Sequence, residues 1–294
     1  MNSTTTATSI FGTTSWITAF TVSLICWFIL VWIFACLICY GVRNKKWSIG
    51  NGDSDDRDSL ILYTLAVVAT SFSIIHTTIN IVTYNFGHDE ASLQTCVVGV
   101  LLSVEFFAFT MSWTYLFLWF RQRAIYKHNL FIHLYTPLVR VISWLSIFLM
   151  LLGINSAIII YNVCSKFSST GAGCVNKGAH WPAIYGTAVN GTGQIAMFLL
   201  FLYPVVNIPT VRSTCRIIRI LKRTTICTAF CIGSDLVAGI YVGVSKESDK
   251  IGLSFYNFNL VLNIIAMVIT FAMWWRIILS PFNFASENEA PSPA

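Results

Sequence analysis

The chain has 294 residues, of which 56% are hydrophobic and only 10% are charged, and its mean hydropathy is +0.71. Soluble domains carry about 25% charged residues, so this composition excludes an ordinary soluble protein and indicates a membrane protein. The net charge of +6 does not indicate nucleic-acid binding, because the basic residues lie in short loops beside apolar runs, where they set membrane topology.

The first 15 residues are rich in threonine and serine and contain the glycosylation sequon Asn2-Ser3-Thr4. They lack the basic start and short apolar core of a cleavable signal peptide, so we expect the first apolar run to act as a signal anchor. Residues 1–15 are predicted to form an extracellular N-terminus that is glycosylated at Asn2.

Seven apolar runs of about 20 residues follow, each long enough to cross a bilayer. The sixth is the weakest, because it is short and contains Asp235 among several glycines. The pattern predicts an all-α membrane protein, with a seven-transmembrane helix bundle over residues 16–275 and a short cytoplasmic tail over 276–294. The spans are residues 16–40, 60–84, 93–119, 138–161, 183–207, 225–244 and 253–275.

The basic residues define an orientation. Of the 18 lysines and arginines, 14 lie in the loops after the first, third and fifth spans or in the tail. Because basic loops stay in the cytoplasm, the N-terminus is predicted outside and the C-terminus cytoplasmic, in a multi-pass protein of the plasma membrane.

The third span carries a cysteine at one end and an arginine at the other. Cys96 and Arg121 are 25 residues apart, which in a helix is roughly 37 Å, or one bilayer with part of its interfaces. Arg121 can hydrogen-bond a neighbouring helix end or a partner's backbone, and the alternative is an interfacial arginine that only sets topology.

Two further cysteines, Cys164 and Cys174, lie on the same predicted outer side as Cys96. A Cys96–Cys174 disulfide would tie the third helix to the loop after the fourth span. A Cys164–Cys174 disulfide would instead close a small loop and leave Cys96 free. The first pairing restricts the unfolded chain more, which favours it without excluding the second.

These features together resemble the rhodopsin-like G-protein-coupled receptors. Cys96, Arg121 and Cys174 match that family's disulfide and third-helix arginine, Trp144 matches the fourth-helix tryptophan and Pro204 the fifth-helix proline. The chain departs from the family at Phe120, where an acidic residue is expected, and in its seventh span, which has no Asn-Pro-x-x-Tyr motif and offers only Asn263. It is similar to a divergent, orphan or chemosensory receptor.

The resemblance implies a receptor that transduces an unknown extracellular ligand's signal to a heterotrimeric G protein. It also implies a Cys96–Cys174 bridge and packing roles for Trp144 and Pro204. On the inner side, basic residues at helical spacing predict a G-protein docking surface or a strip attracted to anionic lipid headgroups. The residues expected to couple to the G protein are Arg121, Arg123, Arg216, Arg219 and Arg223.

Ionisable residues inside a membrane span are functional candidates by default. Glu105 in the third span is a candidate counter-ion for a cationic ligand. Asp235 in the sixth, with Asn263 in the seventh, is expected to act in helix packing, with ion binding or a helix break as alternatives for Asp235. Aromatic and polar residues near the outer ends of the spans predict a ligand pocket, formed by Ser103, Glu105, Phe106, Phe107, Tyr256 and Asn259.

Other functional classes have less support in the sequence. An intramembrane zinc hydrolase needs several histidines, whereas only His76 lies within a span, where it is expected to be a hydrogen-bonded core residue. A retinal-linked pump needs a lysine in the seventh span, and residues 253–275 contain none. We therefore expect no enzyme activity, cofactor or metal. A channel or transporter lined by Glu105 and Asp235 is the remaining alternative.

Overall fold

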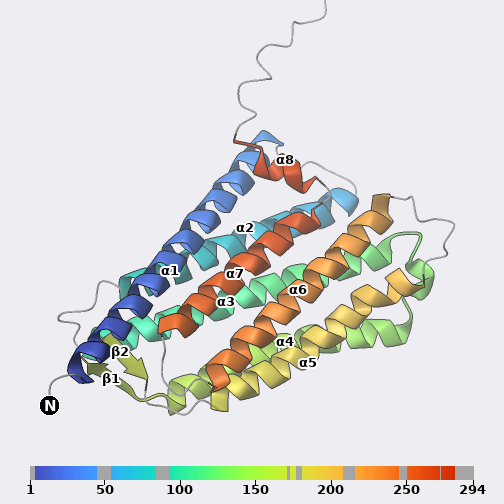
Figure 1. Cartoon of the computed structure of the whole chain (residues 1–294). Helices are drawn as coiled ribbons and strands as arrows, with labels where there is room; N and C mark the ends of the chain where they lie inside the picture. Colours follow the sequence, from blue (N-terminus) through green and yellow to red (C-terminus); the bar gives the residue numbers. More distant parts are fainter. Residues whose placement is uncertain are drawn as a thin grey trace, which may run out of the picture.

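The computed structural model describes residues 4–44, 54–83, 93–170, 173–176, 181–207, 216–244, 250–271 and 273–281. Seven long helices cross the molecule side by side, and a small hairpin contacts the third of them at one end of the molecule (Figure 1). The long helices are α1 (Thr4–Arg43), α2 (Ser54–Ile81), α3 (Leu93–Lys127), α4 (Pro137–Cys164), α5 (Trp181–Val206), α6 (Arg216–Val244) and α7 (Lys250–Thr270). The short elements are the 3₁₀ helix η2 (Ile132–Leu134), strands β1 (Phe167–Thr170) and β2 (Gly173–Asn176), and α8 (Trp274–Ile278).

Six helices, α1 to α6, are long and apolar enough to span a membrane. This confirms the prediction of an all-α, multi-pass membrane protein. Of the 21 residues of α7, the stretch Ser254–Thr270, whose side chains the structure describes, is also an apolar helix. The predicted sixth span has the lowest mean hydropathy of the six, 1.4, yet α6 is one continuous helix through Asp235, so no helix break occurs there.

The long helices form a closed ring in chain order, because each contacts the next and α7 contacts α1. Helix α3 also contacts α5 and α7 across the ring, which makes it the central helix. One apolar cluster joins α1, α2, α3 and α7 around Leu30 and Ile264. A second cluster contains residues of all five helices from α3 through α7, around Met150 and Leu221. Apolar side chains such as Phe230, 74% exposed, also face outward, as expected where lipid rather than water surrounds the helices.

The two ends of the bundle differ in character. At the hairpin end, β1 pairs antiparallel with β2, with Ser169 opposite Cys174, and both strands contact α3. At the other end, called the arginine end after Arg121 and Arg223, the short helix α8 packs against α1 (Figure 1). The Ser280 hydroxyl fixes this contact by donating to the Cys36 carbonyl at 2.8 Å. The predicted tail therefore begins inside a helix that is docked on the bundle.

Candidate functional site

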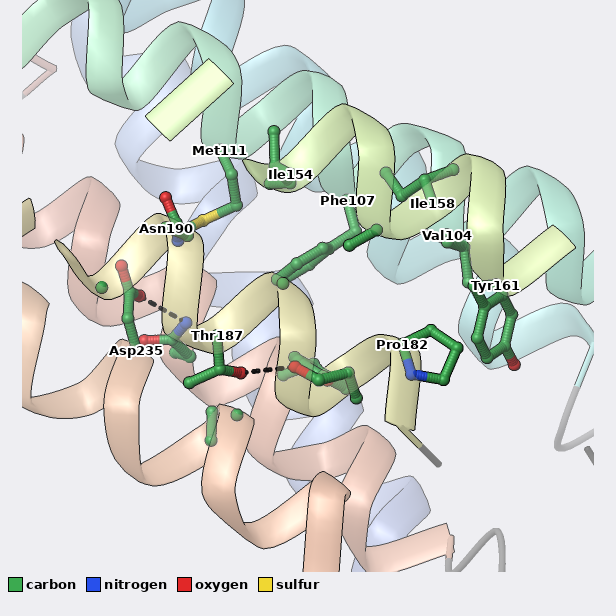
Figure 2. Close-up of a pocket in the computed structure, with 18 of the residues that line it drawn as sticks. Val104, Phe107, Met111, Ile154, Ile158, Tyr161, Pro182, Thr187, Asn190 and Asp235 are labelled. Atoms are coloured by element: carbon green, nitrogen blue, oxygen red, sulfur yellow. Dashed lines mark hydrogen bonds between the residues drawn. The ribbon is translucent and has the colours of Figure 1, made fainter. Parts of the chain in front are cut away.

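A cavity of about 250 Å³ lies inside the bundle, bordered by residues of α2 to α7. Asp235, Asn190 and Met111 lie at one end of the cavity, and Tyr161 and Pro182 lie at the other (Figure 2). Tyr161 is close to the end of α4 and Pro182 to the start of α5, the two helices that the hairpin connects. The cavity therefore extends from the middle of the bundle toward the hairpin end.

The α3 wall of the cavity is a single helical stripe. Its residues lie three, four, seven, eleven and fifteen positions after the first, which places them on one face of the helix. They are Val100, Ser103, Val104, Phe107, Met111 and Tyr115. The ring of Tyr256, on α7, meets the ring of Phe107 edge-on, with the ring centres 4.9 Å apart. The walls are thus mainly apolar and aromatic, as in most small-molecule sites.

Glycines on α5 and α6 border the cavity where these helices pack closely against their neighbours. Gly186, Gly191 and Gly239 all line it. A β-carbon at Gly239 would overlap the side chain of Thr187, so only glycine lets α5 and α6 approach this closely.

The Asp235 carboxylate is the polar centre of the cavity. Its Oδ1 accepts hydrogen bonds from the amides of Asn259 and Asn263, both on α7, at 2.8 and 2.9 Å. Its Oδ2 accepts from the Gln194 amide of α5 at 2.5 Å and from the Tyr115 hydroxyl of α3 at 3.2 Å. One carboxylate therefore joins four helices through four neutral donors.

Tyr115 extends this group to a further residue. Its hydroxyl oxygen accepts hydrogen bonds from the amides of Asn190 and Gln194, each at 2.7 Å. We call Tyr115, Asn190, Gln194, Asp235, Asn259 and Asn263 the Asp235 cluster. All of its amides direct their N–H groups toward the carboxylate or the tyrosine.

The amide oxygens of the Asp235 cluster are left without donors. The buried oxygens of Asn190, Gln194, Asn259 and Asn263 accept no hydrogen bond from the part of the chain that the structure describes. Gln194 and Asn259 are each only 3% exposed, so bulk water does not reach these groups. Unpartnered buried acceptors are unfavourable by about 1–3 kcal/mol each, and a bound group that donates hydrogen bonds would relieve this.

Asp235 also has no cationic hydrogen-bond partner among the residues that the structure describes. No lysine or arginine occurs among the residues that line the cavity. His76 is there, but both of its ring nitrogens are engaged: Nδ1 with the Ser103 carbonyl at 2.8 Å, and Nε2 with the Asn80 amide at 2.9 Å. Because a carbonyl accepts and an amide donates, this arrangement assigns the proton to Nδ1 and leaves the ring neutral.

A second polar group, the His76 cluster, consists of Ser23, His76, Asn80, Ser103 and Asn257. The Asn80 amide donates to His76 and, at 3.0 Å, to the Asn257 oxygen, while its own oxygen accepts from the Ser103 hydroxyl. The Asn257 amide donates to Ser23 at 2.9 Å. His76 is therefore the hydrogen-bonded core residue that the sequence predicts.

Four of the six residues predicted to bind ligand line the cavity, namely Ser103, Phe107, Tyr256 and Asn259. The other two lie elsewhere. Glu105 accepts from the Asn162 amide of α4 at 3.1 Å, and Phe106 packs against Phe72 and Phe109. The reason is the helical period: one or two residues away from Phe107, the side chain leaves the α3 stripe.

Sequence reasoning missed three members of the Asp235 cluster, namely Tyr115, Asn190 and Gln194. Two signals point to them. Tyr115 continues the α3 stripe by whole helical turns from Phe107, and Asn190 and Gln194 are amides four residues apart in an apolar span. Asn190 also belongs to a sequon, but its side chain is directed to Tyr115 within the bundle.

At the arginine end, two guanidinium groups converge on the end of α7. Arg121 of α3 donates through Nη2 to the Thr270 carbonyl at 2.8 Å. Arg223 of α6 donates through Nη2 to the Phe271 carbonyl at 2.5 Å. These carbonyls belong to the helix terminus, where no intrahelical donor is available, so the arginines cap the negative end of α7.

The remaining predicted coupling and packing residues are more dispersed. Arg123 lies over the rings of Trp119 and Trp144, at 4.7 and 5.5 Å, which places Trp144 in a cation–π group on the bundle surface. Arg219 is exposed, and the side chain of Arg216 lies outside the described residues. Pro204 is buried near the end of α5.

The cysteine predictions are settled only in part by the described residues. Cys164 is a free thiol, so the alternative Cys164–Cys174 bridge is not formed in this structure. The side chains of Cys96 and Cys174 lie outside the described residues, as does Asn2, so the Cys96–Cys174 bridge and the glycan remain predictions. Strand β2, which contains Cys174, contacts helix α3, which contains Cys96.

Comparison with known proteins adds no family to this description. No protein-family model matches the chain, and no curated protein matches it.

Proposed function

We propose that this protein is a seven-helix receptor of the plasma membrane that transmits an extracellular ligand signal to a heterotrimeric G protein. In this proposal α7 is the seventh span, since its 21 residues extend about 31 Å. The hairpin end is extracellular and the arginine end cytoplasmic, as the distribution of basic residues favours.

The observation that carries this proposal is that the same three helices meet at two separate polar contacts. Near the cavity, Asp235 of α6 is bonded to Tyr115 of α3 and to two asparagines of α7. At the arginine end, Arg121 of α3 and Arg223 of α6 are bonded to the end of α7. A ligand that changes the hydrogen bonds of Asp235 therefore acts on α3, α6 and α7. The arginine contact fixes the relative position of the same three helices.

The mechanism follows from these two contacts. Ligand binding beside Asp235 would favour a packing of α3, α6 and α7 that differs from the ligand-free one. Movement of α7 by a fraction of a helical turn would release its terminal carbonyls from the two guanidinium groups. Arg121 and the basic residues of α6 would then be free to contact the G protein, and the exposed Arg219 is already available to it.

The channel alternative is less well supported by the interior of the bundle. Between the two polar contacts, α3 carries the buried residues Phe117, Leu118 and Trp119, and α7 carries Ile264, Met267 and Val268. The intervening threonines of α6, such as Thr224 and Thr228, bond to their own helix backbone. Within the described residues, no row of free polar groups connects the cavity to the arginine end.

The test is nucleotide exchange on purified G proteins. The full chain is reconstituted in nanodiscs with heterotrimers of each Gα class, and GDP release is compared with that over empty nanodiscs. We expect faster release for at least one class and a loss of about tenfold in Arg121→Gln, which keeps a polar side chain but not the guanidinium. Lys127→Gln is the matched control, because Lys127 is a cation of the same helix end paired with Asp58 on the surface.

Two results would contradict the receptor proposal. One is exchange at the background rate with every Gα class, both without ligand and with a ligand that binds the cavity. The other is an ion current across planar bilayers that scales with the amount of protein and needs no G protein, which would support the channel alternative.

A further inference from the structure

The Asp235 cluster has two unmet requirements, and they point to the same kind of ligand. Asn190, Gln194 and Asn259 are among the residues that line the cavity, and their buried amide oxygens accept nothing from the described residues, so a ligand that donates hydrogen bonds would satisfy them. The Asp235 carboxylate has only neutral partners, so the ligand that it favours carries a positive charge. An anion or a ligand that only accepts hydrogen bonds meets neither requirement.

The shape of the cavity separates an organic cation from a bare metal ion. Its volume of about 250 Å³ is several times the roughly 30 Å³ of one water molecule. Away from Asp235 the walls become apolar and aromatic, with Phe107 and Tyr256 in contact and Tyr161 at the far end (Figure 2). A metal ion would use the oxygens and leave this apolar space without an occupant.

We propose that the cavity binds a small organic ammonium compound, with its charged head at Asp235 and its apolar body toward Tyr161. The N–H groups donate to the carboxylate and to the amide oxygens of Asn190, Gln194 and Asn259. The aromatic rings of Phe107 and Tyr256 cover the carbon skeleton. This inference deepens the receptor proposal by naming the ligand class of that same cavity.

The structure assigns the counter-ion role to Asp235 instead of Glu105. Both are acids within spans, but Glu105 is turned toward Asn162 of α4 and does not line the cavity. The pair supplies a matched control: Asp235→Asn and Glu105→Gln each remove one intramembrane carboxylate and keep its size.

The experiment measures the melting temperature of the full chain in nanodiscs over a concentration series of each probe. The probes are methylamine, butylamine and 2-phenylethylamine, which are cationic at pH 7, with methanol, butanol and 2-phenylethanol as neutral counterparts. We expect butylamine and 2-phenylethylamine to stabilise the unmodified protein and Glu105→Gln, and the alcohols to have no effect. In Asp235→Asn the affinity should fall at least about 30-fold, because the ammonium loses its buried charged partner.

A second variant guards against misfolding of Asp235→Asn. Gln194→Leu keeps the carboxylate but removes a free acceptor oxygen together with the amide that donates to Tyr115 and Asp235, so it should weaken amine binding by about tenfold. The proposal is overturned if none of the amines stabilises the protein, if the alcohols match them, or if Asp235→Asn binds amines as well as the unmodified protein. Stabilisation by sodium chloride over an equal concentration of potassium chloride that requires Asp235, with no amine effect, would instead show a metal-ion site.

This readout contains no G protein, so the two proposals fail separately. Amine binding without nucleotide exchange would retain the ligand class and reject the coupling function. Exchange without amine binding would do the reverse.

Discussion

The two polar clusters of the bundle contain similar side chains but differ in how completely they are hydrogen-bonded. In the His76 cluster, Asn80 uses both its amide group and its oxygen, and each partner is a protein group. In the Asp235 cluster, the amides of Asn190 and Gln194 donate while their oxygens accept nothing from the described residues. The first cluster is complete without a ligand, and the second is not.

This difference separates a structural polar group from a binding one within the same bundle. A closed network in a low-dielectric interior stabilises one helix packing, and any loss from it leaves groups unsatisfied. An open network gains most when another molecule supplies what is missing. Both clusters border the same cavity, since His76 and Ser103 also line it, so position alone does not distinguish them.

The largest effect on stability is expected from opening the closed cluster. Asn80→Leu removes three hydrogen bonds at a site that is 1% exposed, so that His76, Ser103 and Asn257 each lose one partner. We expect a loss of about 3 kcal/mol, or roughly 6 °C or more in Tm measured in nanodiscs. A Tm equal to that of the unmodified protein would show that the completeness of this network contributes nothing to stability.

An intermediate effect is expected from removing the link between α3 and the open cluster. Tyr115→Phe deletes the hydroxyl that donates to Asp235 and accepts from Asn190 and Gln194. Asp235 keeps three other donors, so the loss should be about 1–2 kcal/mol, or roughly 3 °C in Tm. Tyr203→Phe, at a position 41% exposed on the bundle surface, is the control and should change Tm by less than about 1 °C. Equal losses in the two variants would contradict the role given to Tyr115.

The last prediction concerns binding and not stability, and it compares two neighbouring phenylalanines of α3. Phe107→Ala removes the ring that covers the cavity, and the affinity for 2-phenylethylamine should fall about tenfold. Phe106→Ala removes a ring that packs against Phe72 and Phe109 outside the cavity, and the affinity should not change. A reversed order of the two affinities would place the ligand on another face of α3.

Much of the fold was predictable, because it depends on local composition. Apolar runs near 20 residues predict spanning helices whatever their neighbours, and six of the seven are long and apolar enough for this in the structure. The helix start at Pro137 is equally local, since Thr136 accepts from the Val139 amide as an N-cap.

The site was predictable only where one helix determines it. Ser103, Glu105, Phe106 and Phe107 were all predicted from their depth in the span, and only Ser103 and Phe107 lie on the face of α3 that lines the cavity. The bonds of Asp235 to Tyr115, Gln194 and Asn259 join residues on four different helices. Such partners follow from the packing of the whole bundle, which a single sequence does not specify.

The most direct test of the central claim measures two quantities on two variants, Asn80→Leu and Asp235→Asn. For each, the Tm without ligand and the rise in Tm with 2-phenylethylamine are compared with those of the unmodified protein. We predict opposite outcomes for the two variants. Asn80→Leu lowers the Tm measured without ligand but keeps the rise in Tm with 2-phenylethylamine. Asp235→Asn loses that rise, and its Tm without ligand falls by less than that of Asn80→Leu. If both variants lose the rise to the same degree, or neither does, then unsatisfied acceptors do not mark the binding site in this protein.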